Sequence, residues 1–143
     1  MTAPLTYYTA DLHLHTVLSP CAELEMIPPL IVRQAVRLGL RLLAVTDHNS
    51  TENAAAMMEA GAREGIVVLP GMELQTREEV HLLCLFDEFA NALRWQERVY
   101  QSLPAIRNRE EVFGSQLIVN AEGDFVAFQE RLLLAATSFS VEE

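Results

Sequence analysis

Hydrophobic and polar positions along the chain follow two periodicities, which predict alternating strands and helices. Helical spacing of apolar residues predicts helices over 28–39, 52–64 and 88–101. Alternating or continuous apolar runs predict strands over 8–14, 40–47, 66–74, 80–86 and 116–120. Ser50 and Thr51 are candidate N-caps of the second helix. A turn at 121–124 and a short apolar helix or loop at 128–137 complete the pattern.

The connection between the third and fourth strands decides how they pair. Only about five residues separate them, whereas a parallel crossover needs about a dozen or more. These strands are therefore expected to form an antiparallel β-hairpin at residues 66–86. The other strands alternate with helices, which suggests parallel pairing. The sequence thus predicts an α/β fold with a mixed sheet.

Neither an internal repeat nor a low-complexity linker divides the chain, so residues 1–143 are expected to form a single domain. The polar motifs fall within a core at 1–87, and residues 88–143 supply a helix, a strand and an insertion. Ser140 followed by Glu143 matches a capping box, which announces a helix. Because no helix follows, we expect a truncation at the C-terminus; the alternative is a frayed tail.

Composition and charge narrow the class of protein. Of 143 residues, 50% are hydrophobic and 21% are charged, which is typical of a globular chain. No apolar run reaches the ~18 residues of a membrane span, and MTAPLTYYTADLH shows no signal peptide, so we expect a cytoplasmic protein without a membrane partner. A net charge of −10 argues against duplex nucleic acid. Bound cations would still admit a phosphorylated substrate.

The motif DLHLHT, residues 11–16, places two imidazoles on one face of a strand. Because strand positions two apart face the same way, His13 and His15 are expected to point into one pocket. Paired imidazoles suit a metal such as Zn, Mn or Fe. Asp11 shares their face and could hold the far nitrogen of a histidine. Taken alone, the motif fits a polar strand face equally well.

Four more polar residues stand at predicted strand ends. Asp47 and His48 follow a buried strand, at the carboxyl end where α/β proteins collect ligands. Glu73 ends the next strand and could bridge two cations, and the hairpin places it beside His81. Simpler interpretations exist for three of these residues: a helix-capping loop for Asp47, a solvated carboxylate for Glu73, and an edge-strand surface histidine for His81.

The order and spacing of these motifs resemble those of the polymerase and histidinol phosphatase (PHP) family, over residues 9–86 and most closely its stand-alone bacterial phosphoesterases. The resemblance implies an α/β fold, the N-terminal portion of a distorted (β/α)7 TIM-like barrel. It also implies two or three divalent ions, Mn, Zn or Fe, that activate water to hydrolyse a phosphate ester. The substrate would be a small metabolite, a nucleotide or an oligonucleotide end. The implied metal ligands are His13, His15, His48, Glu73 and His81, with Asp47 in a supporting role.

Two departures from the family pattern bear on function. Pro20 stands where many members have an aspartate ligand; Cys21 could substitute, although a structural cysteine is the commoner role. Later family ligands would lie beyond Glu143, so this chain alone is expected to bind metal weakly, to be poorly active, and to expose sheet edges through which copies could associate. Cys84 is expected to be a core thiol. The alternative functions are a non-catalytic regulatory or interaction domain and a metal-dependent amidohydrolase.

Overall fold

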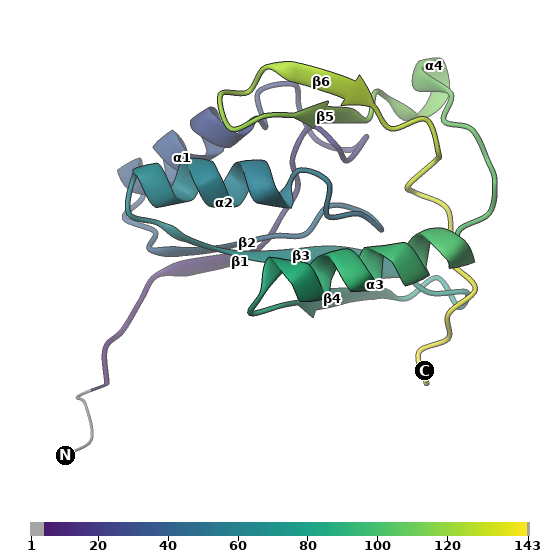
Figure 1. Cartoon of the computed structure of the whole chain (residues 1–143), viewed down its shortest axis with the longest axis horizontal. Coiled ribbons are helices and arrows are strands. Elements are labelled where there is room, and N and C mark those ends of the chain that lie inside the picture. Colours follow the sequence, from purple (N-terminus) through teal and green to yellow (C-terminus); the bar gives the residue numbers. More distant parts are fainter. Residues whose placement is uncertain (1–4, 143) are drawn as a thin grey trace.

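The computed structural model describes residues 5–142 and contains a four-stranded sheet with helices packed against it (Figure 1). Across the sheet the strands are ordered β1 (Ala10–Leu14), β2 (Leu42–Val45), β3 (Val67–Gln75) and β4 (His81–Leu85). β1, β2 and β3 run parallel, and β4 is antiparallel to β3. The predicted α/β class, the mixed sheet and the hairpin are therefore confirmed.

Three helices provide the outer layer: α1 (Pro28–Arg37), α2 (Ala54–Arg63) and α3 (Phe89–Ser102). α1 starts with two prolines, which suit the first turn because its amide groups have no partner within the helix. Gly39 lies just beyond its end with a φ of 70°, a left-handed conformation that favours glycine. In Figure 1, α1 and α2 lie next to each other above the sheet, and α3 runs along β3 and β4.

The apolar core lies on one face of the sheet. Val68 packs in a cluster with α1 and α2, and Met72 of the same strand packs with α3. Even-numbered positions of a strand share a face, so all three helices cover one side. The other side carries Val67, Leu83 and Leu85, which are 59%, 44% and 38% exposed. With helices outside and an inner face that is exposed at Val67, Leu83 and Leu85, the curled sheet is half of a barrel, as expected for the N-terminal portion of a TIM-like fold.

The segment before α2 differs from the predicted capping. Neither Ser50 nor Thr51 caps the helix, which begins after Asn53. The Ser50 Oγ instead lies 2.7 Å from the Tyr100 hydroxyl, and the Thr51 amide donates to Gln96 Oε1 at 2.6 Å. Both hydroxyl residues are buried beside α3, where a polar group needs a hydrogen-bond partner. Their hydrogen bonds to α3 therefore take precedence over the local preference to cap α2.

A second, two-stranded antiparallel sheet follows α3. Its elements are the short helix α4 (Glu110–Phe113) and the strands β5 (Leu117–Val119) and β6 (Phe125–Phe128). β5 was predicted, and so was the turn, where the Asn120 amide donates to the Asp124 carbonyl at 3.0 Å. Neither α4 nor β6 was predicted. Phe125 and Val126 are 56% and 58% exposed, so β6 lacks the alternation that marks a half-buried strand.

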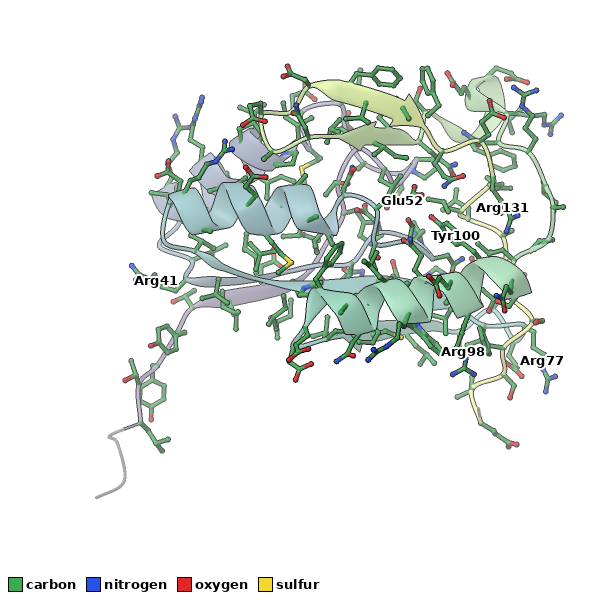
Figure 2. All side chains as sticks on the ribbon, in the orientation of Figure 1. Arg41, Glu52, Arg77, Arg98, Tyr100 and Arg131 are labelled. Carbon is green, nitrogen blue, oxygen red and sulfur yellow. The ribbon has the colours of Figure 1, made fainter. Side chains whose placement is uncertain are left out.

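The chain then returns against α3 as a loop, so residues 128–137 contain no helix. Gln129 donates to the Glu52 carboxylate at 2.9 Å and to the Tyr100 hydroxyl at 3.3 Å. Arg131 donates to the Tyr100 carbonyl, and Figure 2 shows Glu52, Tyr100 and Arg131 gathered at this junction. These contacts tie the C-terminal segment to α3 and to the loop that follows β2.

Two sequence predictions fall partly outside the described residues. The capping box includes Glu143, and the N-terminal segment tested for a signal peptide includes residues 1–4. Over residues 5–142, none of the helices combines the length and apolarity that a bilayer crossing requires.

Gly71 of β3 is expected to be intolerant of a side chain. A Cβ at this position would lie 2.7 Å from the Cys84 carbonyl oxygen and 3.1 Å from the Val45 carbonyl oxygen, both backbone atoms of neighbouring strands. Gly71→Ala should therefore lower the free energy of unfolding by about 1–3 kcal/mol, measured by urea denaturation. Val67→Ala, at an exposed position of the same strand, is the control. A Gly71→Ala variant as stable as the wild type would contradict this tight strand spacing.

Candidate metal centre

Four histidines and one glutamate converge at one end of the sheet. His13 comes from β1 and His15 follows it; His48 follows β2; Glu73 lies in β3 and His81 begins β4. Glu73 is the centre of the group. Its Oε2 lies 2.9 Å from His15 Nε2, 3.3 Å from His13 Nε2 and 3.5 Å from His48 Nδ1, and its Oε1 lies 2.8 Å from His81 Nδ1.

Strand geometry explains why these side chains meet. In β1, Leu14 enters the core while His13 and His15 on either side face the opposite way, as the alternation predicted. In the hairpin, Glu73 is opposite Leu83 and Gln75 is opposite His81, so Glu73 and His81 are diagonal neighbours on one face. The predicted juxtaposition of Glu73 and His81 is thus present in the structure.

The donor set fits a divalent cation. Among the residues that the structure describes there are three groups, and within each group the ligand atoms lie within 4.8 Å of one another: His13, His15 and Glu73; His48, Glu73 and His81; and His15, Cys21 and His48. Imidazole nitrogens and a carboxylate are ligands that Zn, Mn and Fe accept. The Nδ1 of His48 is buried and lies 3.5 Å from Glu73 Oε2, and within residues 5–142 it forms no hydrogen bond, so it remains available to interact with a bound group. These clusters could therefore hold metal ions.

Burial and neighbouring charges shift the titration of the central residues. Desolvation, followed by the neighbouring charge of His15, lowers the pKa of His48 to about 4. Burial acts to raise the pKa of Glu73, but hydrogen bonding to His81 and the charge of His48 outweigh it, so this pKa lies below its usual value. His48 is accordingly neutral near pH 7, as a metal ligand must be.

Acidification should destabilise the metal-free chain through His48. Between the ordinary histidine pKa of 6.5 and about 4, the unfolded chain binds a proton at this residue that the folded chain does not. The free energy of unfolding therefore rises with pH across this window, by at most about 1.4 kcal/mol per unit from one proton. His48→Asn should flatten that slope in urea titrations with a chelator present. Above pH 7 the two slopes should coincide, and parallel curves down to pH 4 would contradict the assignment.

Asp47, for which a supporting role was predicted, contributes no ligand atom to the three groups. It is 1% exposed and accepts three hydrogen bonds: from the Thr16 amide at 2.7 Å, the Thr16 hydroxyl at 2.8 Å and the Ser19 hydroxyl at 2.7 Å. Burial raises the pKa of Asp47, and the Ser19 and Thr16 hydrogen bonds partly offset it. Ser19 also accepts from the His48 amide at 3.1 Å, so the network fixes the backbone that carries His48.

Two asparagines were missed as organising residues. Asn49, in a left-handed conformation with φ of 49°, accepts from the Gln75 amide at 2.9 Å and donates to the Leu133 carbonyl at 2.8 Å. Asn53 donates to the Thr16 hydroxyl at 2.9 Å. Both are fully buried and join segments distant in sequence. The signal for them in the sequence was weak. A run of polar residues after a buried strand implies that these side chains are buried with hydrogen-bond partners, but it does not identify the partners.

Cys21 was considered as a substitute ligand, and its thiol does lie at the cluster. Its Sγ is 3.3 Å from His15 Nδ1 and 3.5 Å from His48 Nε2. Partial burial raises the pKa of this thiol, and the charges of Asp47 and Glu73 act in the same direction. Cys84, by contrast, is partly buried and packs against the apolar cluster that contains Met72 and Val99, consistent with its expected place in the core.

Comparison with known proteins connects this geometry to a family. The PHP domain profile matches residues 11–136. The 5'-3' exoribonuclease Rnm of Salmonella typhimurium is 33% identical over 86 residues, which make up 57% of this chain and 28% of that protein. The phosphoribosyl 1,2-cyclic phosphate 1,2-diphosphodiesterase of Eggerthella lenta is 33% identical over 90 residues, 58% of this chain and 33% of that protein. The chain thus spans about a third or less of the length of these curated relatives.

Two solved structures share the fold. A protein from Bifidobacterium adolescentis, provisionally described as a metal-dependent phosphoesterase, superposes with a TM-score of 0.50 at 26% identity, over 71% of this chain and 41% of that one. An amidohydrolase from Chromobacterium violaceum, with bound sulfate and no metal, gives a TM-score of 0.50 at 32% identity, over 62% of this chain and 32% of that one.

Proposed function

Because this chain belongs to the PHP domain family, we propose that it is the metal-binding part of a hydrolase that cleaves phosphate esters with metal-activated water. The substrate class is a small phosphorylated metabolite, a nucleotide or an oligonucleotide end. The metal ligands in this proposal are those implied by the family resemblance: His13, His15, His48, Glu73 and His81.

One observation carries the proposal: a single buried carboxylate lies within 3.5 Å of four imidazoles from three separate segments of the chain. A structural polar cluster would hardly need four histidines around one acid, because each uncharged ring requires its own partners. A carboxylate with two oxygens facing different imidazoles is suited to bridge two cations. Glu73 Oε1 faces His81, and Oε2 faces the other three rings.

The roles of the protein groups follow from their positions. When bound, divalent cations supply charge neutralisation for a phosphate ester and activation of the attacking water. The chain's own residues position the metal ligands. Asp47 and Ser19 fix the His48 backbone, and the hairpin register places Glu73 beside His81. His13 and His81 have half-exposed side chains, at 49% and 42%, so the cluster is open to a substrate on that side.

The named activities of the relatives favour a phosphodiester or phosphate ester over other bonds. An exoribonuclease and a cyclic phosphate diphosphodiesterase both cleave phosphate esters. The similarity to an amidohydrolase keeps amide hydrolysis as the second candidate function. That structure contains bound sulfate, an anion that resembles phosphate in shape and charge.

The test is a hydrolysis screen of the purified chain with Mn, Zn or Fe added. Because the chain holds only part of the family's ligands, slow release of phosphate or nucleotide from esters, absent for amides and lactones, is expected. His13→Ala should abolish it, and because that side chain is half-exposed the fold should be preserved. Leu12→Ala, at the adjacent partly exposed position, is the control for the substitution itself. Amide hydrolysis without ester hydrolysis would favour the second candidate, and failure to bind any divalent cation would overturn the proposal.

Association through the uncovered side of the sheet is proposed for the same chain. β1 and β4 are the edges of the four-stranded sheet, and Leu83 and Leu85 of β4 are exposed beside one edge. Open edges and uncovered apolar side chains favour self-association. Light scattering should therefore detect a dimer, and a monomer at all concentrations would contradict it.

A further inference from the structure

The second nitrogen of two histidines faces the Cys21 thiol. In His15, Nε2 lies 2.9 Å from Glu73 and Nδ1 lies 3.3 Å from the Cys21 Sγ. In His48, Nδ1 faces Glu73 at 3.5 Å and Nε2 faces the same sulfur at 3.5 Å. Each ring thus has the Glu73 carboxylate on one side and the thiol on the other. The three ligand atoms of His15, Cys21 and His48 lie within 4.8 Å of one another.

The loop that presents the thiol is held by contacts from several directions. Ser19 donates to Asp47 and accepts from the His48 amide, which links the loop directly to a histidine of the centre. Pro20 has a fixed φ, and a Cβ on Gly114 would lie only 2.9 Å from the Pro20 carbonyl oxygen. The α4–β5 connection therefore packs closely behind this loop, and Cys21 occupies a defined position.

We propose that Cys21 is a thiolate ligand of a cation that it shares with Nε2 of His48. This position is distinct from the two groups of candidate ligands that contain Glu73. The proposal rests on the proposed metal-dependent function and adds one ligand and a metal preference to it. His15 ligates through Nε2 on the Glu73 side, and its Nδ1–H donates to the thiolate. The Nδ1–H of His48 then points to the Glu73 carboxylate, the usual outer partner of a metal-bound imidazole.

A sulfur ligand changes which metal is preferred. Thiolate is a soft donor that binds Zn or Fe in preference to Mn or Mg, whereas carboxylates suit the harder ions. Metal binding displaces the thiol proton, so the ligand becomes the thiolate only when the ion is present. Cys21 is exposed, which leaves an entry route for the ion and open coordination positions for water or a phosphate oxygen.

The chain contains two cysteines, which provides a matched control. Co²⁺ added to the wild-type chain should give a thiolate-to-cobalt charge-transfer band in the near ultraviolet, and Cys84→Ser should retain it. Cys21→Ser should lose the band while circular dichroism stays unchanged. Cys21→Asp should also lose it but keep a cation at this position, with the Zn-to-Mn affinity ratio lowered at least about tenfold.

The outcomes separate this proposal from the proposed function. If Co²⁺ binds, as judged by its visible transitions, but the wild-type chain shows no charge-transfer band, then Cys21 is not a ligand and the metal centre itself stands. A band that disappears in Cys84→Ser and persists in Cys21→Ser overturns the assignment to Cys21. If the wild-type chain binds no Co²⁺, the metal-dependent function and the Cys21 proposal fail together.

Discussion

Glu73→Gln is expected to lower the affinity of the chain for divalent cations by more than about 100-fold. Substitution of groups that only orient metal ligands typically costs 10- to 100-fold, and Glu73 contacts all four imidazoles itself. Glutamine keeps the shape of the side chain but removes the charge and one of the two acceptor oxygens. It therefore tests bridging without opening a cavity. Isothermal titration with Zn or Mn is the measurement.

The same substitution should be visible in thermal unfolding. A ligand at 100 times its Kd stabilises the folded state by about 2.7 kcal/mol, which raises the Tm of a domain of this size by roughly 5–15 °C. Glu73→Gln should show little or no such rise at the same metal concentration. Glu78→Gln removes an exposed carboxylate that pairs only with the neighbouring Arg77 among the ion pairs of the described residues, so it should respond like the wild type. Equal metal-induced shifts in both variants would rule out a central role for Glu73.

Asp47→Ala is expected to lower the free energy of unfolding by about 3–5 kcal/mol. The substitution leaves two hydroxyls and one backbone amide without their acceptor in a fully buried position. Each unsatisfied buried group costs about 1–3 kcal/mol, with partial relief where the structure relaxes. It would also release the loop from Thr16 to Ser19, which holds the His48 amide. Urea denaturation of the metal-free chain gives the value directly.

Asp87→Ala is the appropriate comparison for Asp47. Asp87 is an exposed aspartate that accepts from Asn91 within the same helix region, and its loss should change stability by no more than about 0.5 kcal/mol. Asp47→Asn should fall between the two, since the amide retains one acceptor oxygen but directs an N–H₂ group at donors. A destabilisation by Asp47→Ala no larger than that by Asp87→Ala would show that the buried network contributes little.

The positions of most candidate metal ligands could be predicted from local features of the sequence. The positions of His13 and His15 on the face opposite Leu14 follow from strand geometry, which repeats every two residues whatever surrounds the strand. The nearness of Glu73 and His81 followed from the length of the connection between their strands, because so short a segment permits only a hairpin. The convergence of His48 on the same end was expected from the rule for parallel strands and is seen in the structure.

The supporting interactions could not be read in this way. A supporting role was predicted for Asp47, but its donors Thr16 and Ser19 lie about thirty residues away in the sequence, and no local pattern pairs them with it. Ser50 and Thr51 carried a capping signal, yet their partners are on α3, so packing against that helix took precedence. β6 was not predicted because both of its faces are largely exposed, so its sequence lacks the alternation of apolar and polar residues.

The sequence by itself determined which side chains share a strand face and which strands form the hairpin, because backbone periodicity and connection length are local properties. Only the tertiary structure decided that the Cys21 thiol lies between His15 and His48, that Asp47 is enclosed by hydroxyls of a preceding loop, and that Leu83 and Leu85 on one side of the sheet are exposed. Those features depend on how the loop after β1 packs onto the loop after β2. Such packing is set by the summed contacts of the whole chain, which no short stretch of residues encodes.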